Sequence, residues 1–410
     1  MEVITGGDFK RMVSGAYSEF LLEYEKINQS YGAGELPGTH ILRTLGAAVM
    51  PLNDTNDDSI GGLSRRVATA AIFGARGNAG VILSQLFRGI AAGLQSKTEA
   101  TSSEFGKAFQ YGILHARRIL SEIPEQNAFL DAAKVAAKSA HDAVRDELPI
   151  PEILNAALDA GKKIFSENFS EDAGSKIMFT FLSGCLKGLD GNFVSPAVSL
   201  SLGLGTHENM PDPRDDVVKP YCVILKVKNP HANAEEIERR LQEFGNFALA
   251  TKKGSAVEIH LHTDHVGRVM EQAVGWGPLR DIRVINMSES HALGIHDALM
   301  PVAALAVASD KSTARKYQDA GAQILIAGSK NSCPSVAELV GAAHSDLASS
   351  YVLVASNPND RLVFVQVKKL LGARVELVLT NNEEETIEAL QKFSVTKSAA
   401  ENALFMSSKN

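Results

Sequence analysis

The sequence has few cysteines and no long apolar run. Its three cysteines, Cys185, Cys222 and Cys333, are scattered and odd in number, which excludes a disulfide framework and favours a reducing compartment. No stretch of eighteen or more uncharged apolar residues occurs, so no integral membrane segment is predicted. The chain opens Met1-Glu2-Val3 without a basic region followed by an apolar one, and we expect a cytoplasmic protein.

An excess of positive charge is also missing. The net charge is -7 and the pI is near 5.9, which leaves no broad basic surface for a phosphodiester backbone and argues against nucleic acid as a partner. The composition, with 45% hydrophobic and 22% charged residues, is that of a globular protein. At 410 residues the chain is long enough for two or three domains.

The first half of the chain has the apolar period of helices. From residue 8 to about 203, apolar positions recur at helical spacing, as in 9–24, 65–72, 105–119 and 128–144. We therefore predict an all-helical domain over residues 1–205.

The polar, proline-rich stretch 207–220 marks a domain boundary. After it the pattern predicts a small α/β middle domain over 216–295, with strands at 221–225, 257–262 and 283–287. Beyond residue 296 four short apolar runs alternate with helical segments, at 302–308, 323–326, 351–354 and 374–379. This alternation predicts a C-terminal α/β domain, over 296–410, with a mostly parallel sheet.

The segment from Gly74 to Gly89 is the most distinctive one, because its glycine-rich turn leads directly into an apolar helix. Such a turn exposes backbone N–H groups at a helix N-terminus, where the helix dipole favours an anion. Glycines before a helix also serve as caps or close-packing positions, so the pattern alone leaves a phosphate site and a structural turn both open.

The wording of this segment, Gly-Ala-Arg-Gly-Asn-Ala-Gly-Val-Ile-Leu-Ser-Gln from Gly74, resembles the signature of the DhaL kinase domain. That domain occurs in dihydroxyacetone kinases and in fatty-acid kinase A of bacteria. The opening from Gly7 to Met12 and the run from Glu171 to Gly174 resemble two further family segments. The resemblance implies a helical barrel that holds ATP and magnesium at one end. It places the nucleotide at Thr39, His40, Gly77, Asn78, Ala79, Gly80, Asp172 and Gly174.

The chain departs from the family in the loop that should hold magnesium. The family loop reads Pro-Asp-Gly-Asp-Thr-Gly-Thr-Asn, and alignment on Gly38-Thr39 places Gly34 and Leu36 where its two aspartates stand. Magnesium prefers carboxylate and water oxygens, so both hard ligands are lost. Glu35 lies between the two positions, and a second source of ligands is the acidic run Asp54, Asp57 and Asp58, which is otherwise a solvated loop.

Other changes fall in the same family segments. His40 replaces the asparagine of the loop, and Ala79 replaces the serine of the phosphate turn, which removes a hydroxyl donor. The segment 126–128 reads Gln-Asn-Ala where the family has Glu-Gly-Thr. We therefore expect either a pseudokinase or a kinase that takes its metal ligands from elsewhere.

A second group of residues is Cys222 with His260 and His262. Histidines at i and i+2 on a strand share a face, and Cys222 begins another apolar strand, so the three allow a tetrahedral zinc site. Packing alone also explains such residues. The segments around them resemble the middle domain of fatty-acid kinase A, which implies that all three bind zinc. Asp264, His265 or a water is then the fourth ligand.

The loops at 328–335 and 357–360 resemble ligand loops of the family's last domain, which implies a fatty-acid-binding partner protein. The resemblance also implies a homodimer formed through the middle domain. Cys333 itself is expected to be a small buried or loop residue, since no histidine is close in sequence to activate it.

Three functions follow from these patterns. The first is an ATP-dependent phosphotransferase component that acts on an acyl group, or on a dihydroxyacetone-like substrate, presented by the partner. The alternative is a pseudokinase that serves as a binding or regulatory scaffold. A zinc hydrolase with Asp264 as its base is the third.

Overall fold

The structure is a computed structural model, and it describes most of the chain. The described residues are 3–31, 36–52, 57–120, 128–146, 148–167, 173–192, 221–241, 243–244, 246–263, 265–286, 300–327, 333–343 and 348–408. They fall into two units. The first comprises Met1–Pro213, Asn331–Val336 and Asn359–Gln366, and the second comprises Arg214–Lys330, Ala337–Pro358 and Val367–Asn410.

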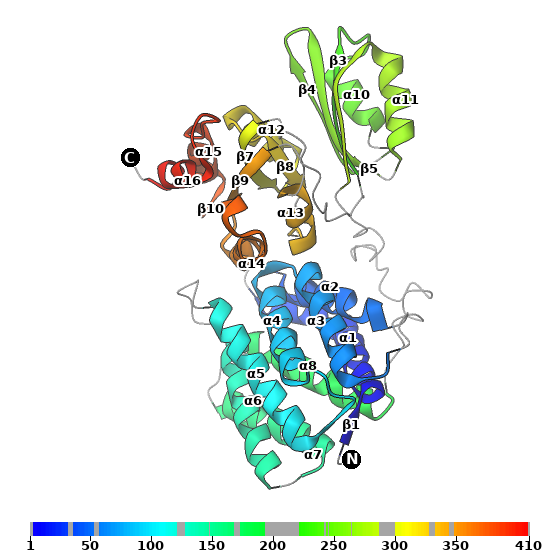
Figure 1. Ribbon diagram of the computed structural model, residues 1–410, viewed down its shortest axis with the longest axis vertical. Coiled ribbons are helices and arrows are strands. Elements are labelled where there is room, and N and C mark those ends of the chain that lie inside the picture. The colour runs from blue at the N-terminus through cyan, green and yellow to red at the C-terminus, as the bar shows by residue number, and fades with distance from the viewer. Residues whose placement is uncertain are drawn as a thin grey trace. The chain divides into compact units, whose positions relative to one another are not determined.

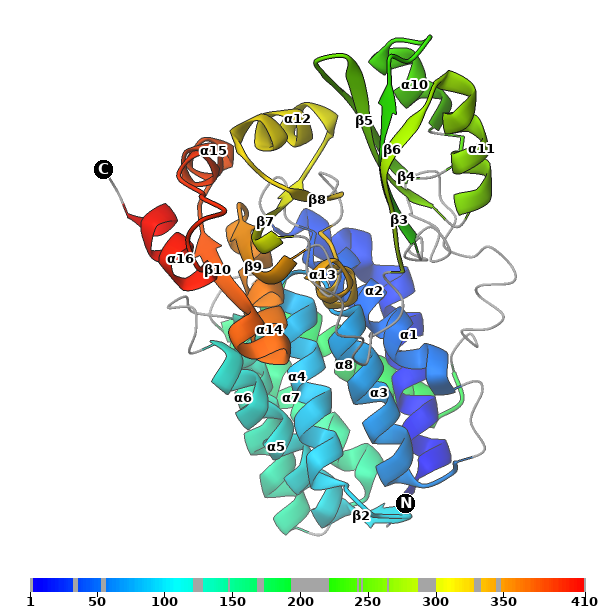
Figure 2. The ribbon, with the colours of Figure 1, turned by 45° about the horizontal axis from the view of Figure 1, so that its top comes forward.

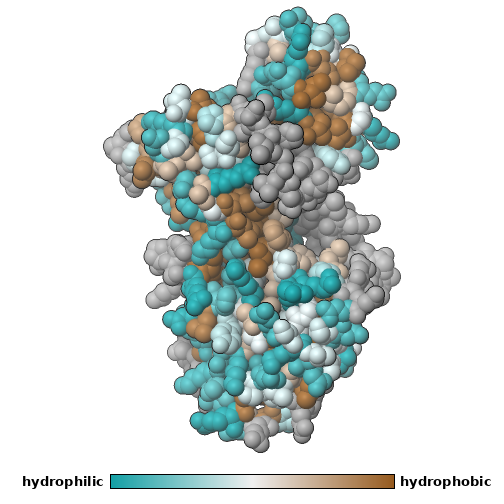
Figure 3. All heavy atoms as spheres, in the orientation of Figure 1, coloured by the Kyte–Doolittle hydropathy of each residue, from teal (hydrophilic) through white to brown (hydrophobic). Residues whose placement is uncertain are grey.

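The first unit is mostly helical, as predicted, and its long helices lie side by side (Figures 1 and 2). Its helices are α1 (Gly6–Gln29), α2 (Pro37–Val49), α3 (Ile60–Gly74), α4 (Gly77–Gly93), α5 (Ser102–Leu120), α6 (Ala128–Arg145), α7 (Ile150–Glu167) and α8 (Ala173–Leu189), with a short 3-10 helix at Met50–Leu52. On the face drawn in Figure 3, their outer surface carries mainly hydrophilic and intermediate residues. Amphipathic helices packed on a shared apolar core leave such a surface. Closure of these helices into a barrel remains a prediction.

The segment from Gly7 to Met12, which resembles the family opening, begins α1. The Thr5 side chain accepts the Asp8 backbone N–H at 3.2 Å, and the Asp8 carboxylate accepts the Thr5 backbone N–H at 2.8 Å. This reciprocal pair is a capping box, which satisfies N–H groups that a helix start leaves free. Asp8 therefore acts in the start of the helix.

Helices α1 and α8 pack backbone to backbone. A Cβ atom added at Gly15 would lie 2.2 Å from the carbonyl oxygen of Gly184 and 2.6 Å from the Cα of Gly188. Only glycine fits at such a distance, because any side chain would force the two helices apart. Gly188 in turn lies against Arg11 and Met12, so the two helices run antiparallel.

Two short strands correct the all-helical prediction. Strand β1 (Val3–Thr5) pairs antiparallel with β2 (Glu99–Thr101), and Ile4 of β1 is fully buried. Three residues are too few to show a period in the sequence, and each strand leads directly into a helix.

A four-stranded antiparallel sheet forms one part of the second unit. Its strands are β3 (Tyr221–Lys228), β4 (Asn246–Lys253), β5 (Ala256–Thr263) and β6 (Leu279–Asn286), in the order β4-β5-β3-β6. Helices α10 (Ala234–Leu241) and α11 (Val266–Trp276) cover one face, where they share an apolar core with β3, β4 and β5 (Figure 1).

Strand β4 was missing from the prediction, which had three strands here. Among the side chains of β4 that the structure describes, the buried ones are Ala248 and Ala250, and the strand ends in Lys252 and Lys253. Alanine and lysine are depleted in strands, so the local signal is weak, and the strand lies at the edge of the sheet.

The other sheet of this unit is parallel, as predicted. Its strands are β7 (Met300–Ala308), β8 (Ile324–Ala327), β9 (Ala348–Ala355) and β10 (Val375–Leu379), in the order β10-β9-β7-β8. Its helices are α12 (Lys311–Ala320), α13 (Val336–Ala343), α14 (Arg361–Leu371), α15 (Glu383–Gln391) and α16 (Ala399–Ser407), with 3-10 turns at Pro358–Asp360 and Gly372–Arg374.

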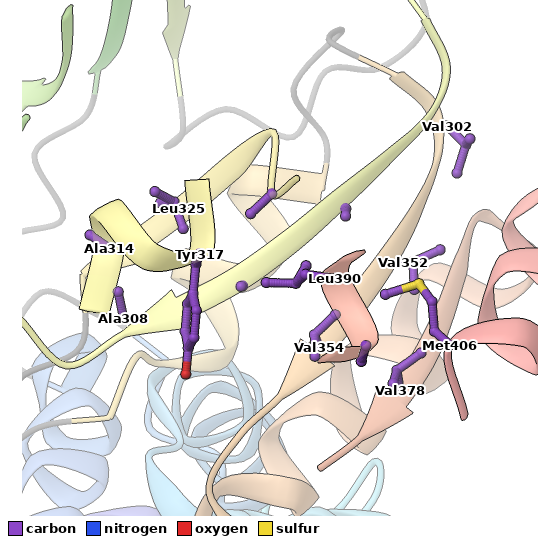
Figure 4. Packing of buried hydrophobic residues seen from close by; sticks show 14 of the residues in the cluster. Val302, Ala308, Ala314, Tyr317, Leu325, Val352, Val354, Val378, Leu390 and Met406 are labelled. Carbon is purple, nitrogen blue, oxygen red and sulfur yellow. The ribbon is translucent and has the colours of Figure 1, made fainter. Parts of the chain in front are cut away.

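One core cluster joins this sheet to three of its helices. Figure 4 shows Met406 of α16 beside the strand residues Val352 and Val378, and Tyr317 of α12 and Leu390 of α15 further along the same cluster, all of them buried. Both faces of a parallel sheet are usually covered, so its strands are apolar runs in the sequence. Within the described part of the chain, no helix is long and apolar enough to cross a membrane.

Candidate functional site

The start of α2 carries the first predicted nucleotide residues. Its N-cap position, Leu36, offers no side-chain acceptor, and Asn28 of α1 takes that role instead. The Asn28 Oδ1 atom accepts the backbone N–H of Gly38 at 2.8 Å, and its Nδ2 donates to the Thr39 hydroxyl at 2.8 Å. Thr39 is 8% exposed, and its hydroxyl is held against α1 by this hydrogen bond.

His40 follows on the same helix and lies against the glycine-rich turn. A Cβ at Gly77 would lie 2.2 Å from the His40 Nδ1 atom, and Gly77 has a φ of 57°. Although part of the ring is accessible, burial, with the nearby charges of Arg43 and Arg76, lowers the pKa of His40 to about 3. The imidazole is therefore neutral at physiological pH.

Thr44, one turn further along α2, joins this helix to α4. Its hydroxyl donates to the carbonyl oxygen of His40 at 2.7 Å and accepts the backbone N–H of Arg76 at 3.3 Å. A Cβ at Gly80 would lie 2.4 Å from that hydroxyl oxygen. Thr39, His40, Gly77, Asn78, Ala79 and Gly80 are thus brought together at the starts of α2 and α4, and their role in binding a nucleotide remains a prediction.

Two segments from far along the chain, around Cys333 and Leu362, contact the glycine-rich turn. The Arg76 guanidinium donates to the carbonyl oxygen of Cys333 at 2.6 Å, and the backbone N–H of Gly77 donates to the Cys333 Sγ at 2.8 Å. The backbone N–H of Leu362 donates to the Asn78 Oδ1 at 2.9 Å. Residues 333–336 and 359–366 belong to the same unit as the helices.

Further contacts extend this packing on either side of the turn. The backbone N–H of Val336 donates to the carbonyl oxygen of Ala75 at 3.1 Å. The Gln85 Nε2 donates to the Gln366 Oε1 at 2.9 Å, where both side chains are almost fully buried. Residues 75–77 of the turn are therefore buried, while Asn78 and Ala79 are half-buried.

Cys333 is buried, as expected, and its thiol is neutral. Desolvation by burial, together with the Asp360 carboxylate, raises the pKa of this thiol well above its ordinary value, although Arg76 acts against that shift. The thiol hydrogen-bonds to Asp360, whose side chain is itself buried. A neutral, water-excluded thiol is a poor nucleophile.

The start of α8 lies near the same end of α1. The Lys176 ammonium donates to the Ser30 hydroxyl at 2.8 Å, and Ser30 caps α1 two residues after Asn28. Gly174 is in the first turn of α8, while Asp172 lies outside the described residues. The starts of α2 and α8 therefore lie at the end of α1, and the start of α4 packs against that of α2.

The alternative magnesium ligands lie elsewhere. A Cβ at Gly6, the first residue of α1, would lie 2.1 Å from the carbonyl oxygen of Asp58, whereas Asn28 holds Thr39 near the last turn. Twenty-two residues of helix separate Gly6 from Asn28, about 33 Å at 1.5 Å per residue. Asp57 and Asp58 are therefore too far away to supply ligands at the turn, and the hypothesis is wrong for these two residues.

Asp57 has a local role instead. Its Oδ1 accepts the backbone N–H of Ser59 at 3.0 Å and the Ser59 hydroxyl at 2.6 Å, and these bonds lower the pKa of Asp57. Ser59 in turn caps α3. Asp54 lies outside the described residues.

The family's magnesium loop does not fit magnesium in this chain. Leu36 offers an apolar side chain at one aspartate position, and Gly34 at the other has no side chain. Gly34 and Glu35 lie outside the described residues. What the described site offers is backbone N–H groups at helix starts and one guanidinium, a set suited to an anion.

The candidate zinc residues occupy neighbouring strands. In the ladder between β3 and β5, Cys222 is directly opposite His262, and His260 is opposite Ile224. Val223 and Leu261 belong to the buried core under the helices. Because strand residues alternate between faces, Cys222, His260 and His262 hold positions on the other face. Their side chains lie outside the described part, as does Asp264, and His265 is exposed.

No sequence pattern indicated that residues 333–336 and 359–366 contact the glycine-rich turn. The loops 328–335 and 357–360, which overlap these residues, were interpreted as loops for a partner protein, because strand ends in parallel sheets usually carry ligand sites. Contacts across 250 or more positions leave no period or spacing to recognise. The one usable signal is Arg76, a charged residue inside a glycine turn between two apolar helices.

Comparison with known families and relatives adds three matches in domain order. Residues 37–168 match the DAK2 domain, residues 219–293 the middle domain of FakA-like fatty acid kinase proteins, and residues 303–409 the C-terminal domain of the same proteins. An uncharacterized protein of Staphylococcus epidermidis is 25% identical over 405 residues, which cover 90% of this chain and 73% of the relative. An uncharacterized protein of Staphylococcus aureus is 25% identical over 396 residues, covering 89% and 72%.

Proposed function

The chain belongs to the FakA-like family of fatty acid kinase proteins, and from that premise we propose that it binds a nucleotide without carrying out magnesium-dependent phosphoryl transfer. In this proposal it is a pseudokinase that serves as a binding or regulatory protein. The observation that carries it is the contrast between a retained glycine-rich turn and a metal loop with Gly34 and Leu36 at its carboxylate positions.

Residues at the starts of α2 and α4 have separate roles in the proposal. The helix starts at Gly38 and Gly77 direct their positive dipole ends toward the nucleotide phosphates. Arg76 supplies a fixed positive charge beside them. His40 supports the turn as a neutral ring, since its pKa of about 3 leaves it uncharged.

The partner in this proposal is a fatty-acid-binding protein that presents its acyl group to the pseudokinase, as the family relationship suggests. A regulatory protein of this kind changes the partner's acyl exchange when nucleotide binds. A dihydroxyacetone-like substrate is the other candidate. Adding nucleotide to a mixture of the pseudokinase with its loaded partner and measuring release of labelled fatty acid tests the first choice; release that is unchanged by nucleotide contradicts it.

The second candidate function is an ATP-dependent phosphotransferase. Its support is that Thr39, Gly77, Asn78 and Gly80 remain in family order and lie together at two helix starts. Catalysis of phosphoryl transfer depends on neutralising the charge that develops on the phosphoryl group. Without the family's two carboxylates this chain lacks the usual means of holding the metal that does so.

A restoration experiment separates the two functions. The double variant Gly34→Asp with Leu36→Asp rebuilds the family loop, and Gly34→Asn with Leu36→Asn is its uncharged control. Transfer from γ-labelled ATP to the loaded partner is measured for each protein in magnesium. We expect no transfer by the natural chain or the control and measurable transfer by the aspartate variant. Transfer by the natural chain would establish the phosphotransferase instead.

We further propose that Cys222, His260 and His262 bind one zinc ion. The support is their register: residues opposed on antiparallel strands have Cβ atoms about 5 Å apart, which suits ligands of one metal. Three protein ligands leave a fourth position for a water, Asp264 or His265. When bound, a zinc of this kind holds the two strands together and acts as a Lewis acid.

A homodimer formed through the middle domain is the last element of the proposal. Val274 of α11 and Ile282 and Val284 of the edge strand β6 are each between 45% and 63% exposed. Exposed apolar residues on an unpaired edge favour association. Light scattering of the natural chain should give twice the mass of one chain, and Val284→Lys should reduce it to one; a natural chain that is monomeric contradicts this element.

A further inference from the structure

The glycine-rich turn is already engaged by the chain itself. A helix start leaves its first N–H groups without helical partners, and these are the groups that would hold a phosphate. At α4 the first of them, the N–H of Gly77, donates to the Cys333 Sγ, and Arg76 donates to the carbonyl oxygen of the same residue. The Asn78 side chain is engaged by the N–H of Leu362.

Burial shows that this engagement excludes solvent. Arg76 is 5% exposed, Cys333 is 6% exposed and Asp360 is 8% exposed. Leu362 and Val336 are fully buried on either side. A phosphate group cannot reach the N–H of Gly77 unless residues 333–336 move away from it.

The groups in contact with the turn are polar and hydrogen-bonded to one another. Cys333 accepts from Gly77, and its thiol is bonded to the Asp360 carboxylate. Asp360 thus brings a carboxylate close to the helix start, where the dipole favours an anion. A phosphate that reached the turn would take the place of Cys333 as acceptor of the Gly77 N–H, and its negative charge would take the place of the Asp360 carboxylate near the helix start.

We propose that residues 333–336 and 359–366 form an autoinhibitory cap, which competes with nucleotide phosphate for Gly77 and Asn78 and must leave the turn before a nucleotide binds. This inference rests on the proposed nucleotide site. The capped form lowers the apparent affinity for nucleotide by the fraction of molecules that are open. A partner that draws either segment away from the turn then increases nucleotide binding.

The experiment uses a matched pair of substitutions at the cap. Cys333→Ala removes the acceptor of the Gly77 N–H, whereas Cys333→Ser keeps a group that accepts from Gly77 and donates to Asp360. Cys185→Ala, which removes the buried thiol of α8 far from the turn in the apolar core, is the control for loss of a buried sulfur. Binding of ATP is measured by calorimetry on the full chain in EDTA.

Cys333→Ala is expected to bind ATP at least about tenfold more tightly than the natural chain, which corresponds to about 1.4 kcal/mol. Cys333→Ser and Cys185→Ala should bind within about twofold of the natural chain. Equal affinity of Cys333→Ala and the natural chain would overturn the cap.

Amide hydrogen exchange supplies a measurement that needs no nucleotide. The cap predicts that peptides containing Gly77 and Leu362 are protected in the natural chain and exchange at least about tenfold faster in Cys333→Ala. If ATP binds to none of the proteins, the proposed nucleotide site fails, and exchange still decides the cap. Rapid exchange at Gly77 in the natural chain would contradict the cap whatever the affinities are.

Discussion

The backbone N–H of Gly77 donates a hydrogen bond to the Sγ of Cys333 at 2.8 Å, across 256 positions of the sequence. The donor belongs to the turn most similar to the family's phosphate-binding segment, and the acceptor belongs to a segment that sequence reasoning assigned to partner binding. The same turn is held from its other side by His40. Its conformation is therefore determined by residues from two distant parts of the chain.

Gly77→Ala tests whether the turn requires glycine for space as well as for backbone freedom. Gly77 and Gly191 both have positive φ, at 57° and 77°, but only Gly77 has a neighbour, His40 Nδ1, within reach of an added Cβ. The left-handed conformation costs about 1–2 kcal/mol for alanine at either place. Overpacking against His40 should add about 1–3 kcal/mol at Gly77 alone. Urea unfolding of Gly77→Ala and Gly191→Ala measures the difference in the free energy of unfolding. Equal losses of stability in the two variants would show that His40 moves aside.

His40 should make stability depend on pH. Its pKa is about 3 in the folded chain and near 6.5 when unfolded, so the unfolded state binds the proton more readily. The contribution of neutral His40 to the free energy of unfolding is complete above pH 6.5 and is lost as the pH falls toward 3. The loss amounts to about 3 kcal/mol by pH 4. Unfolding free energies of the natural chain and of His40→Asn, compared from pH 7 to 4, measure it.

The control for this titration is His141→Asn, at an exposed position of α6. It should leave the pH profile of the natural chain unchanged, whereas His40→Asn should flatten it. A His40→Asn profile that falls as steeply as that of the natural chain would mean that the ring is solvated and protonates normally.

Elemental analysis tests the zinc proposal without any assay of activity. The purified chain should contain about one zinc per molecule, and Cys222→Ser should retain less than about a tenth of it. His231→Ala, an exposed position in the same domain, should keep the full amount. A chain without zinc, whose thermal stability is unchanged by Cys222→Ser, would exclude the site.

The helical domain and the parallel sheet were predictable because their residues carry local periods. In helix α1, apolar residues recur at helical spacing from Phe9 to Tyr24, and β7 is an apolar run from Val302 to Ala308. Strand β4 has alanine at its two described buried positions, 248 and 250, and two lysines at its end, so the sequence signal was too weak to reveal it.

The proximity of the two helix starts was predictable only through the family resemblance. Thr39 and Gly77 were assigned to one place by resemblance, and the packing of His40 on Gly77 brings them together. The distance of Asp58 from the turn follows from the length of α1. That distance excludes Asp58 as a magnesium ligand at the turn, which the sequence alone could not do. The contact with Cys333 depends on tertiary packing across the whole chain, which no local pattern encodes.

Titration of the purified chain with ATP, in EDTA and again in magnesium, tests the proposed function most directly. We expect binding of similar affinity in both buffers, because Arg76 and the helix starts hold the phosphates and positions 34 and 36 hold no metal. Binding that appears only with magnesium would contradict this expectation, since the site would then have a functional metal centre and the chain would be a candidate kinase.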